Sequence, residues 1–156
     1  MVWIMKILGN ISEHLKKIYN RGFIINNDDE IIFDDFLDAS EFITINHSWI
    51  EMVYEGDCTA WHLDGDGYIK NAFDFMLIAT WKYPTEVISE SIPNDYLYDC
   101  TYDLMRKEEF VKKNCEILTA EPGDVVKLNN NEFHRTNPKA YNKKHLVLRR
   151  YYSYYV

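Results

Sequence analysis

Two histidines and one aspartate are the side chains of this sequence best suited to bind a metal ion together. His62 and Asp64 lie in the segment WHLD, and His134 lies in the segment FHRTNP. In an extended chain, residues i and i+2 project to the same face, so His62 and Asp64 can offer a nitrogen and an oxygen to one ion. An HxD triplet alone has little specificity, because it also occurs in turns. With His134 added, the set of two histidines and one carboxylate is typical of non-haem Fe(II) sites, which leave other coordination positions open.

The acidic run DGDGYI, which begins at Asp64, has the look of an EF-hand loop but does not fit one. Aligning Gly67 with the sixth loop position puts His62 at the first position and Phe73 at the twelfth. Calcium needs a carboxylate at the first and a bidentate glutamate at the last. We therefore exclude this class of site and interpret Asp66 as a turn residue.

The composition of the chain narrows the possible function classes. With 156 residues, 47% hydrophobic and 27% charged, the sequence predicts one globular domain rather than a disordered or fibrous protein. The net charge of −8 disfavours general nucleic-acid binding, because an acidic surface repels phosphate. The acidic segments 26–41 and 95–103 likewise disfavour a polyanionic substrate and leave a small molecule, an amino acid or a peptide side chain.

The cysteines and the hydropathy pattern indicate in which cellular compartment the protein is expected. The three cysteines are odd in number and form no CxxC pair, which argues against a disulfide framework or a zinc finger. No apolar run reaches 18 residues and no signal peptide is recognisable, so we expect no membrane span and a cytoplasmic location.

The elements that must position these residues are mostly short strands. Residues 10–21 have the apolar stripe of a helix that ends at Gly22, residues 26–41 predict a second short helix, and residues 104–113 predict one or two helical turns. From residue 42 onward, β-rich runs alternate with Gly/Asp/Asn/Pro clusters, a pattern that favours a sandwich or barrel. The runs are EFITIN, SWIEMVY, DCTAW, FDFMLIATW, CEILT, DVVKL and HLVLRRYYSYYV.

Three details of this pattern are specific enough to test. His47 is expected in a turn between the first two runs, and YPTE at 83–86 is expected to be a turn. In FDFMLIATW the alternation predicts one shared face for Phe73, Phe75, Leu77, Ala79 and Trp81. Trp61 and Trp81 are candidates to flank the metal, although most tryptophans belong to the core.

The order and content of these motifs resemble the Fe(II)/2-oxoglutarate-dependent dioxygenase superfamily. The resemblance spans about residues 49–152 and is carried by WHLDGDG, a long apolar strand, PTE, GDVVKLNNNEFHRTNP and a C-terminal RYY. It implies a double-stranded β-helix, the jelly roll that cupins also use. We therefore expect a mainly β single domain over 1–156, with a jelly-roll core of about eight strands over 42–156. Residues 1–41 are expected to add one or two supporting helices.

The same resemblance implies a site and an activity. His62, Asp64 and His134 would be the Fe(II) ligands, and 2-oxoglutarate would be the cosubstrate. The enzyme would hydroxylate a small-molecule, amino-acid or peptide substrate and release succinate and CO2. The alternative is a jelly roll that is no oxygenase, such as a cupin-like metal-dependent isomerase or a ligand-binding module, which would need no 2-oxoglutarate.

A basic residue near the C-terminus would anchor the distal carboxylate of 2-oxoglutarate. The resemblance implies Arg149, whose planar guanidinium can bind a carboxylate through two parallel hydrogen bonds. Arg150 is the alternative, and adjacent strand residues point to opposite faces, so only one of the two can serve. Lys143 or Lys144 also stays open, since some members use a lysine earlier after the second histidine.

Overall fold

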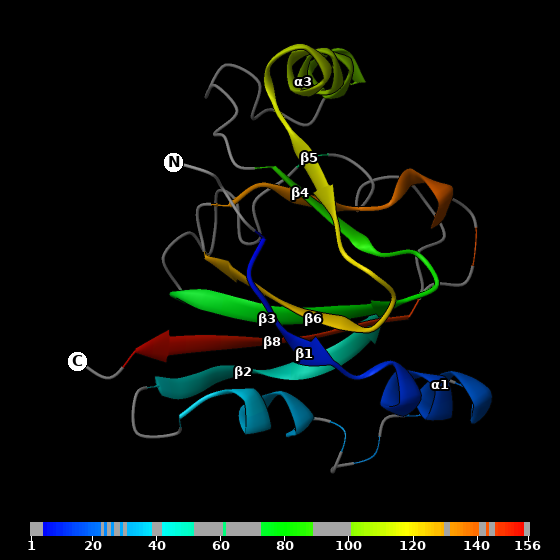
Figure 1. Cartoon of the computed structure of the whole chain (residues 1–156), viewed down its shortest axis with the longest axis vertical. Coiled ribbons are helices and arrows are strands. Elements are labelled where there is room, and N and C mark those ends of the chain that lie inside the picture. The colour runs from blue at the N-terminus through cyan, green and yellow to red at the C-terminus, as the bar shows by residue number, and fades with distance from the viewer. Residues whose placement is uncertain are drawn as a thin grey trace.

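The computed structural model describes residues 5–22, 24, 26, 29, 31–38, 42–51, 61, 73–88, 101–129, 132–140, 143 and 146–154, with the backbone alone at 42–51 and 101–105. These residues form two antiparallel sheets that lie face to face, with helices on the two outer sides (Figure 1). The strands are β1 (Ile7–Asn10), β2 (Phe42–Glu51), β3 (Phe75–Trp81), β4 (Thr85–Ile88), β5 (Ile117–Thr119), β6 (Asp124–Asn129), β7 (His134–Thr136) and β8 (Leu146–Tyr154).

The strand order is that of a jelly roll. The main sheet has the order β1-β6-β3-β8-β2 and the smaller sheet the order β5-β4-β7. The chain crosses from one sheet to the other after β3, β5, β6 and β7, so each sheet is built from strands distant in sequence. This exchange between two antiparallel sheets defines the jelly roll, and the predicted mainly β fold class is confirmed.

Helices cover the outer side of each sheet. On the main sheet lie α1 (Ser12–Asn20) and the 3-10 helix η1 (Ile32–Phe36), and on the smaller sheet lies α3 (Thr101–Asn114) (Figure 1). Within the described residues, neither α-helix contains an apolar stretch long enough to cross a membrane. A second 3-10 helix, η4 (Pro138–Ala140), follows β7.

Three apolar clusters fill the layers. The first, between the main sheet and α1 with η1, contains Leu15, Ile18 and Phe33 against Leu77 and Leu148. The second lies between the sheets, and the third lies between the smaller sheet and α3. The members of the second cluster include Met76, Ile78, Val87, Val126, Leu128, Val147 and Tyr151, and those of the third are Trp61, Ile88, Val111 and Phe133.

The N-terminal region differs from the prediction. The helix expected over 10–21 is present as α1, but residues 7–10 form an edge strand that pairs with β6. Gly9 permits this close packing, since a Cβ there would come within 2.3 Å of the Phe36 ring. Of the helix expected over 26–41, the described residues show Asp29 in α-helical conformation and the five-residue 3-10 helix η1, and residues 31–38 do not form one continuous helix. Phe33 anchors η1 in the core.

The β-rich region also corrects four expectations. His47 lies inside β2 and not in a turn. The strand continues through the polar residues around His47, and its register against β8 shifts there. Thr85 and Glu86 begin β4 and are not a turn. Phe73 lies in the cluster between the sheets, whereas Phe75 lies in the cluster under α1, because Phe73 precedes the regular strand. The helix expected over 104–113 extends over all of α3.

Candidate functional site

The space between the two sheets is the candidate site, because buried polar side chains enter its apolar lining there. We call the two sheet faces that border it the inner faces. The apolar lining comes from Met76 and Ile78 of β3, Val87 of β4, and Val147 and Tyr151 of β8. Strand alternation places five buried polar residues on the same inner faces: Thr80, Thr85, His134, Thr136 and Arg149.

His134 lies on the inner face of the smaller sheet. It is opposite Val87 in the β4–β7 ladder, and only 4% of its surface is exposed. Its ring Nδ1 lies 3.1 Å from the carbonyl oxygen of Glu132. Since a carbonyl only accepts, Nδ1 must donate, which makes Nε2 the basic nitrogen of the neutral ring. Metal-binding histidines are commonly oriented by such a bond from the other ring nitrogen.

Arg149 and Arg150 lie on opposite faces of β8. Arg149 is opposite Ile78 in the β3–β8 ladder and alternates with Val147 and Tyr151, so it belongs to the inner face. Arg150 is opposite Leu77 and belongs to the face covered by α1 and η1. Each is 8% exposed. The two faces therefore give two buried arginines different surroundings.

On the outer face, Arg150 belongs to a polar cluster with η1. Arg150 Nε lies 3.6 Å from Asp34 Oδ1, and the Tyr152 hydroxyl donates a 2.8 Å hydrogen bond to the same oxygen. Burial, together with this hydrogen bond to Asp34, raises the pKa of Tyr152 well above its ordinary value, so the hydroxyl keeps its proton. The cluster ties η1 to β8, a structural role.

Three threonines of the inner faces were not among the residues predicted from the sequence. Thr85 and Thr136 are direct cross-strand neighbours in the smaller sheet, and Thr80 lies opposite Val147 in the main sheet. All three are buried. The signal that could have found Thr80 is the alternation of β3, because Met76, Ile78 and Thr80 share the face opposite the one predicted for Phe75, Leu77, Ala79 and Trp81.

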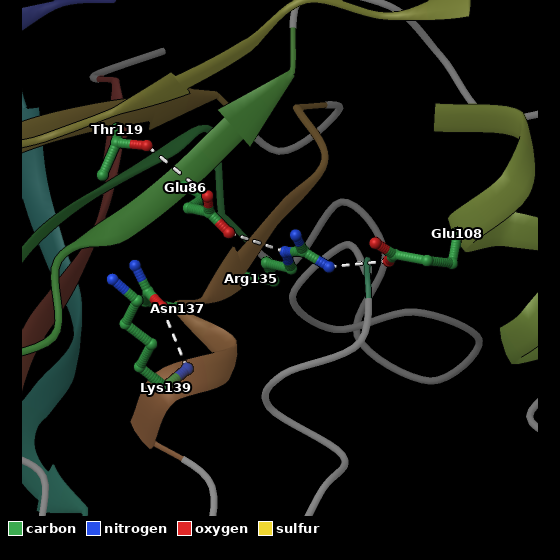
Figure 2. Close-up of polar contacts among 6 residues, drawn as sticks. All are labelled: Glu86, Glu108, Thr119, Arg135, Asn137 and Lys139. Atoms are coloured by element: carbon green, nitrogen blue, oxygen red, sulfur yellow. Dashed lines mark hydrogen bonds and ion pairs between the residues drawn. The ribbon is translucent and has the colours of Figure 1, made fainter. Parts of the chain in front are cut away.

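Arg135, next to His134, faces outward toward α3. Its Nε donates to Glu86 Oε1 at 2.9 Å, and its Nη1 donates to Glu108 Oε2 at 2.6 Å (Figure 2). Its guanidinium carbon lies 4.3 Å from the ring centroid of Trp61, a residue in the cluster under α3. Trp61 therefore contacts β7 from the outer side of the smaller sheet.

The other predicted site residues are placed as follows. His62, Asp64 and Lys144 lie outside the described residues. Lys143 is exposed, with Nζ 5.5 Å from the centroid of the Tyr83 ring. Trp81 packs against the cluster under α1, away from the inner faces. Among the described residues, no group of three His, Cys, Asp or Glu side chains comes together.

No protein-family model matches the chain, and no curated protein matches it. Among solved structures, it is similar to an oxidoreductase of the 2OG-Fe(II) oxygenase family from Burkholderia pseudomallei, with a TM-score of 0.39 and 13% sequence identity. The alignment covers 88% of this chain and 56% of that one, so the chain spans little more than half the length of that protein.

Proposed function

We propose that this protein is an Fe(II)- and 2-oxoglutarate-dependent dioxygenase whose site lies between the two sheets. The observation that carries the proposal is the pair formed by His134 and Arg149. A buried histidine on the inner face of one sheet and a buried arginine on the inner face of the other border the same apolar cluster. A metal ligand and a carboxylate-binding cation on opposite walls suit a ligand that chelates a metal at one end and carries a carboxylate at the other.

Trp61, which precedes the HxD motif in the sequence, contacts the strand that carries His134. His62 follows Trp61 directly, and consecutive Cα atoms are separated by about 3.8 Å. Trp61 contacts Arg135, the residue after His134. The contact thus joins the segment that carries His62 and Asp64 to the strand that carries His134, which favours all three as ligands of one ion.

The residues fit the proposed metal and cosubstrate in type. His62, Asp64 and His134 would hold Fe(II), and the hydrogen bond from Nδ1 of His134 leaves Nε2 as the nitrogen that binds it. Arg149 would bind the distal carboxylate of 2-oxoglutarate. Bound there, the two groups supply an O2-dependent oxidation that releases succinate and CO2.

The chain's own contribution is orientation and shielding. Arg149 would bind the carboxylate of the cosubstrate through its guanidinium, and the apolar Val147, Ile78 and Tyr151 on the same inner face would exclude water, which would strengthen this ionic contact. The buried hydroxyls of Thr80, Thr85 and Thr136 supply further donors to oxygen atoms in the same space. The substrate class proposed is a small molecule, an amino acid or a peptide side chain.

The test measures Fe(II) affinity and Fe(II)-dependent conversion of 2-oxoglutarate to succinate. We expect His62→Ala, Asp64→Ala and His134→Ala each to lose at least about 100-fold in Fe(II) affinity while remaining folded, since even residues that only support a ligand contribute 10–100-fold. His14→Ala is the control, because His14 lies on α1 and pairs with Asp29. Retained Fe(II) affinity in any two of the three variants contradicts the assignment. Metal binding without succinate formation would instead indicate a cupin-like isomerase or binding module.

A further inference from the structure

Arg135 joins three elements of the fold through two carboxylates (Figure 2). It is 7% exposed and lies on β7, with Glu86 of β4 and Glu108 of α3 as its two carboxylate partners. Glu86 is its direct cross-strand neighbour, and the second oxygen of Glu86 accepts a 3.4 Å hydrogen bond from Thr119 of β5. One guanidinium therefore holds β7 to β4 and α3 and, through Glu86, to β5.

The guanidinium of Arg135 lies over the Trp61 ring. The distance from its Cζ to the ring centroid is 4.3 Å, within the range of a cation–π contact, and Trp61 is almost fully buried. Trp61 also packs with Ile88 and Phe133 in the cluster under α3. The arginine contacts two carboxylates and an indole at the same time, a combination that an ammonium group cannot reproduce.

The strand that Arg135 secures is short and carries His134. β7 has three residues and pairs with β4. At its exit, Asn137 Oδ1 accepts a hydrogen bond from the Lys139 N–H at the start of η4 (Figure 2). Because neighbouring strand residues point to opposite faces, fixing Arg135 on the outer side fixes the direction in which His134 projects into the space between the sheets.

We propose that Arg135 is a positioning residue for the metal ligand His134, whose direction it fixes from the outer side of the smaller sheet together with Glu86, Glu108 and Trp61. This inference rests on the proposed function. It assigns to the ion pairs under α3 a role in the metal site on the opposite face of the sheet, beyond holding α3 in place. A supporting residue of this kind changes metal affinity by 10–100-fold when it is removed.

The experiment titrates the 156-residue chain with Co(II), whose visible d–d spectrum reports ligand geometry. We expect Arg135→Lys and Trp61→Phe to weaken Co(II) binding at least about tenfold and to alter the spectrum. Tyr152→Phe is the matched control, because it removes a buried hydrogen bond to Asp34 on the other side of the main sheet. It should lower stability in urea and leave Co(II) affinity and the spectrum unchanged.

The outcomes distinguish a failure of the proposed metal site from a failure of the positioning role of Arg135. If the wild-type chain does not bind Co(II), the proposed function is wrong and this inference fails with it. If the wild type binds and Arg135→Lys binds equally well with the same spectrum, only the positioning role is overturned. Should Arg135→Lys not fold, Glu108→Gln decides, because it removes one charged partner from a half-buried site on α3. A weakened affinity with an altered spectrum supports the role, and wild-type behaviour overturns it.

Discussion

Arg149 and Arg150 are adjacent in sequence and equally buried, yet β8 delivers them to two different regions of the molecule. Arg150 lies toward η1, where Asp34 and the Tyr152 hydroxyl complete a polar cluster between two elements of the fold. Arg149 lies toward the other sheet, alternating with Val147 and Tyr151 and opposite Ile78. Burying an arginine is costly, so each position needs a reason.

The comparison teaches that the strand face, not the residue type, sets the surroundings of each arginine. The surroundings of Arg150 include Asp34, a carboxylate on the helix that covers its face. Arg149 faces the space that it shares with His134, where we propose that an anionic ligand binds.

The largest expected effect is on 2-oxoglutarate binding by Arg149→Ala. Removing one partner of a sheltered charge pair costs about 2–5 kcal/mol, so the affinity should fall at least roughly thirtyfold while Fe(II) binding stays nearly intact. Arg149→Lys should recover only part of the loss, since an ammonium group cannot make two parallel bonds. Isothermal titration with 2-oxoglutarate in the presence of metal measures the affinity of both variants.

Arg150→Ala is the matched control for this prediction. It should lower the free energy of unfolding, because Asp34 loses its cationic neighbour, and should leave 2-oxoglutarate affinity close to that of the wild type. The reverse result, a large loss of affinity for Arg150→Ala and a normal Arg149→Ala, would mean that the two faces of β8 are assigned the wrong way round.

An intermediate effect is expected for Tyr152→Phe, which tests the structural side of the comparison. The variant deletes the hydrogen bond to Asp34 without changing the packing of the ring, and should lower the free energy of unfolding by about 1–2 kcal/mol. Urea unfolding at neutral pH measures this. Unchanged stability would show that the cluster beneath η1 does not hold β8 in place.

The smallest effect is expected for Asp74→Asn, which tests the anchoring of β8 beyond the two arginines. Asp74 Oδ2 accepts 2.7 Å hydrogen bonds from the Ser153 hydroxyl and the Tyr154 N–H, and these lower the pKa of Asp74 below its ordinary 3.8 despite the opposing effect of burial. The ionised Asp74 carboxylate therefore contributes its full stabilisation of the folded state above pH 3.8, and this contribution is lost as the pH falls through the lowered pKa. Urea unfolding from pH 7 downward should show a stability difference from wild type that narrows below pH 3.8. A difference that is constant with pH would contradict this origin.

The parts of the fold that the sequence predicted are those with a strong local period. The stripe of α1 and the apolar runs of β3, β6 and β8 are long enough to bury a face by themselves. The strands β1 and β4 have four residues each; β1 contains Gly9 and β4 follows Pro84, so their conformation comes from their partners in the sheets. The pattern across β2 misleads, because a register shift carries the strand past polar residues.

The residues of the candidate site could be predicted from the sequence only where they belong to a recognisable motif. His134 and Arg149 were proposed from their position in the sequence, and strand alternation gives each a definite face. The contact between Trp61 and Arg135 was not predictable, since it joins residues distant in sequence through the packing of α3 on the smaller sheet. Charge pairs of this kind follow from tertiary structure, which no local pattern contains.

The central claim is tested most directly by an anaerobic titration of the wild-type chain with Fe(II) and 2-oxoglutarate, followed by visible absorption. The account predicts a charge-transfer band that needs both components. The band should be lost in His134→Ala and require at least about thirtyfold more 2-oxoglutarate in Arg149→Ala. A wild-type chain that binds Fe(II) but develops no band with excess 2-oxoglutarate, or a band that survives unchanged in both variants, would contradict it.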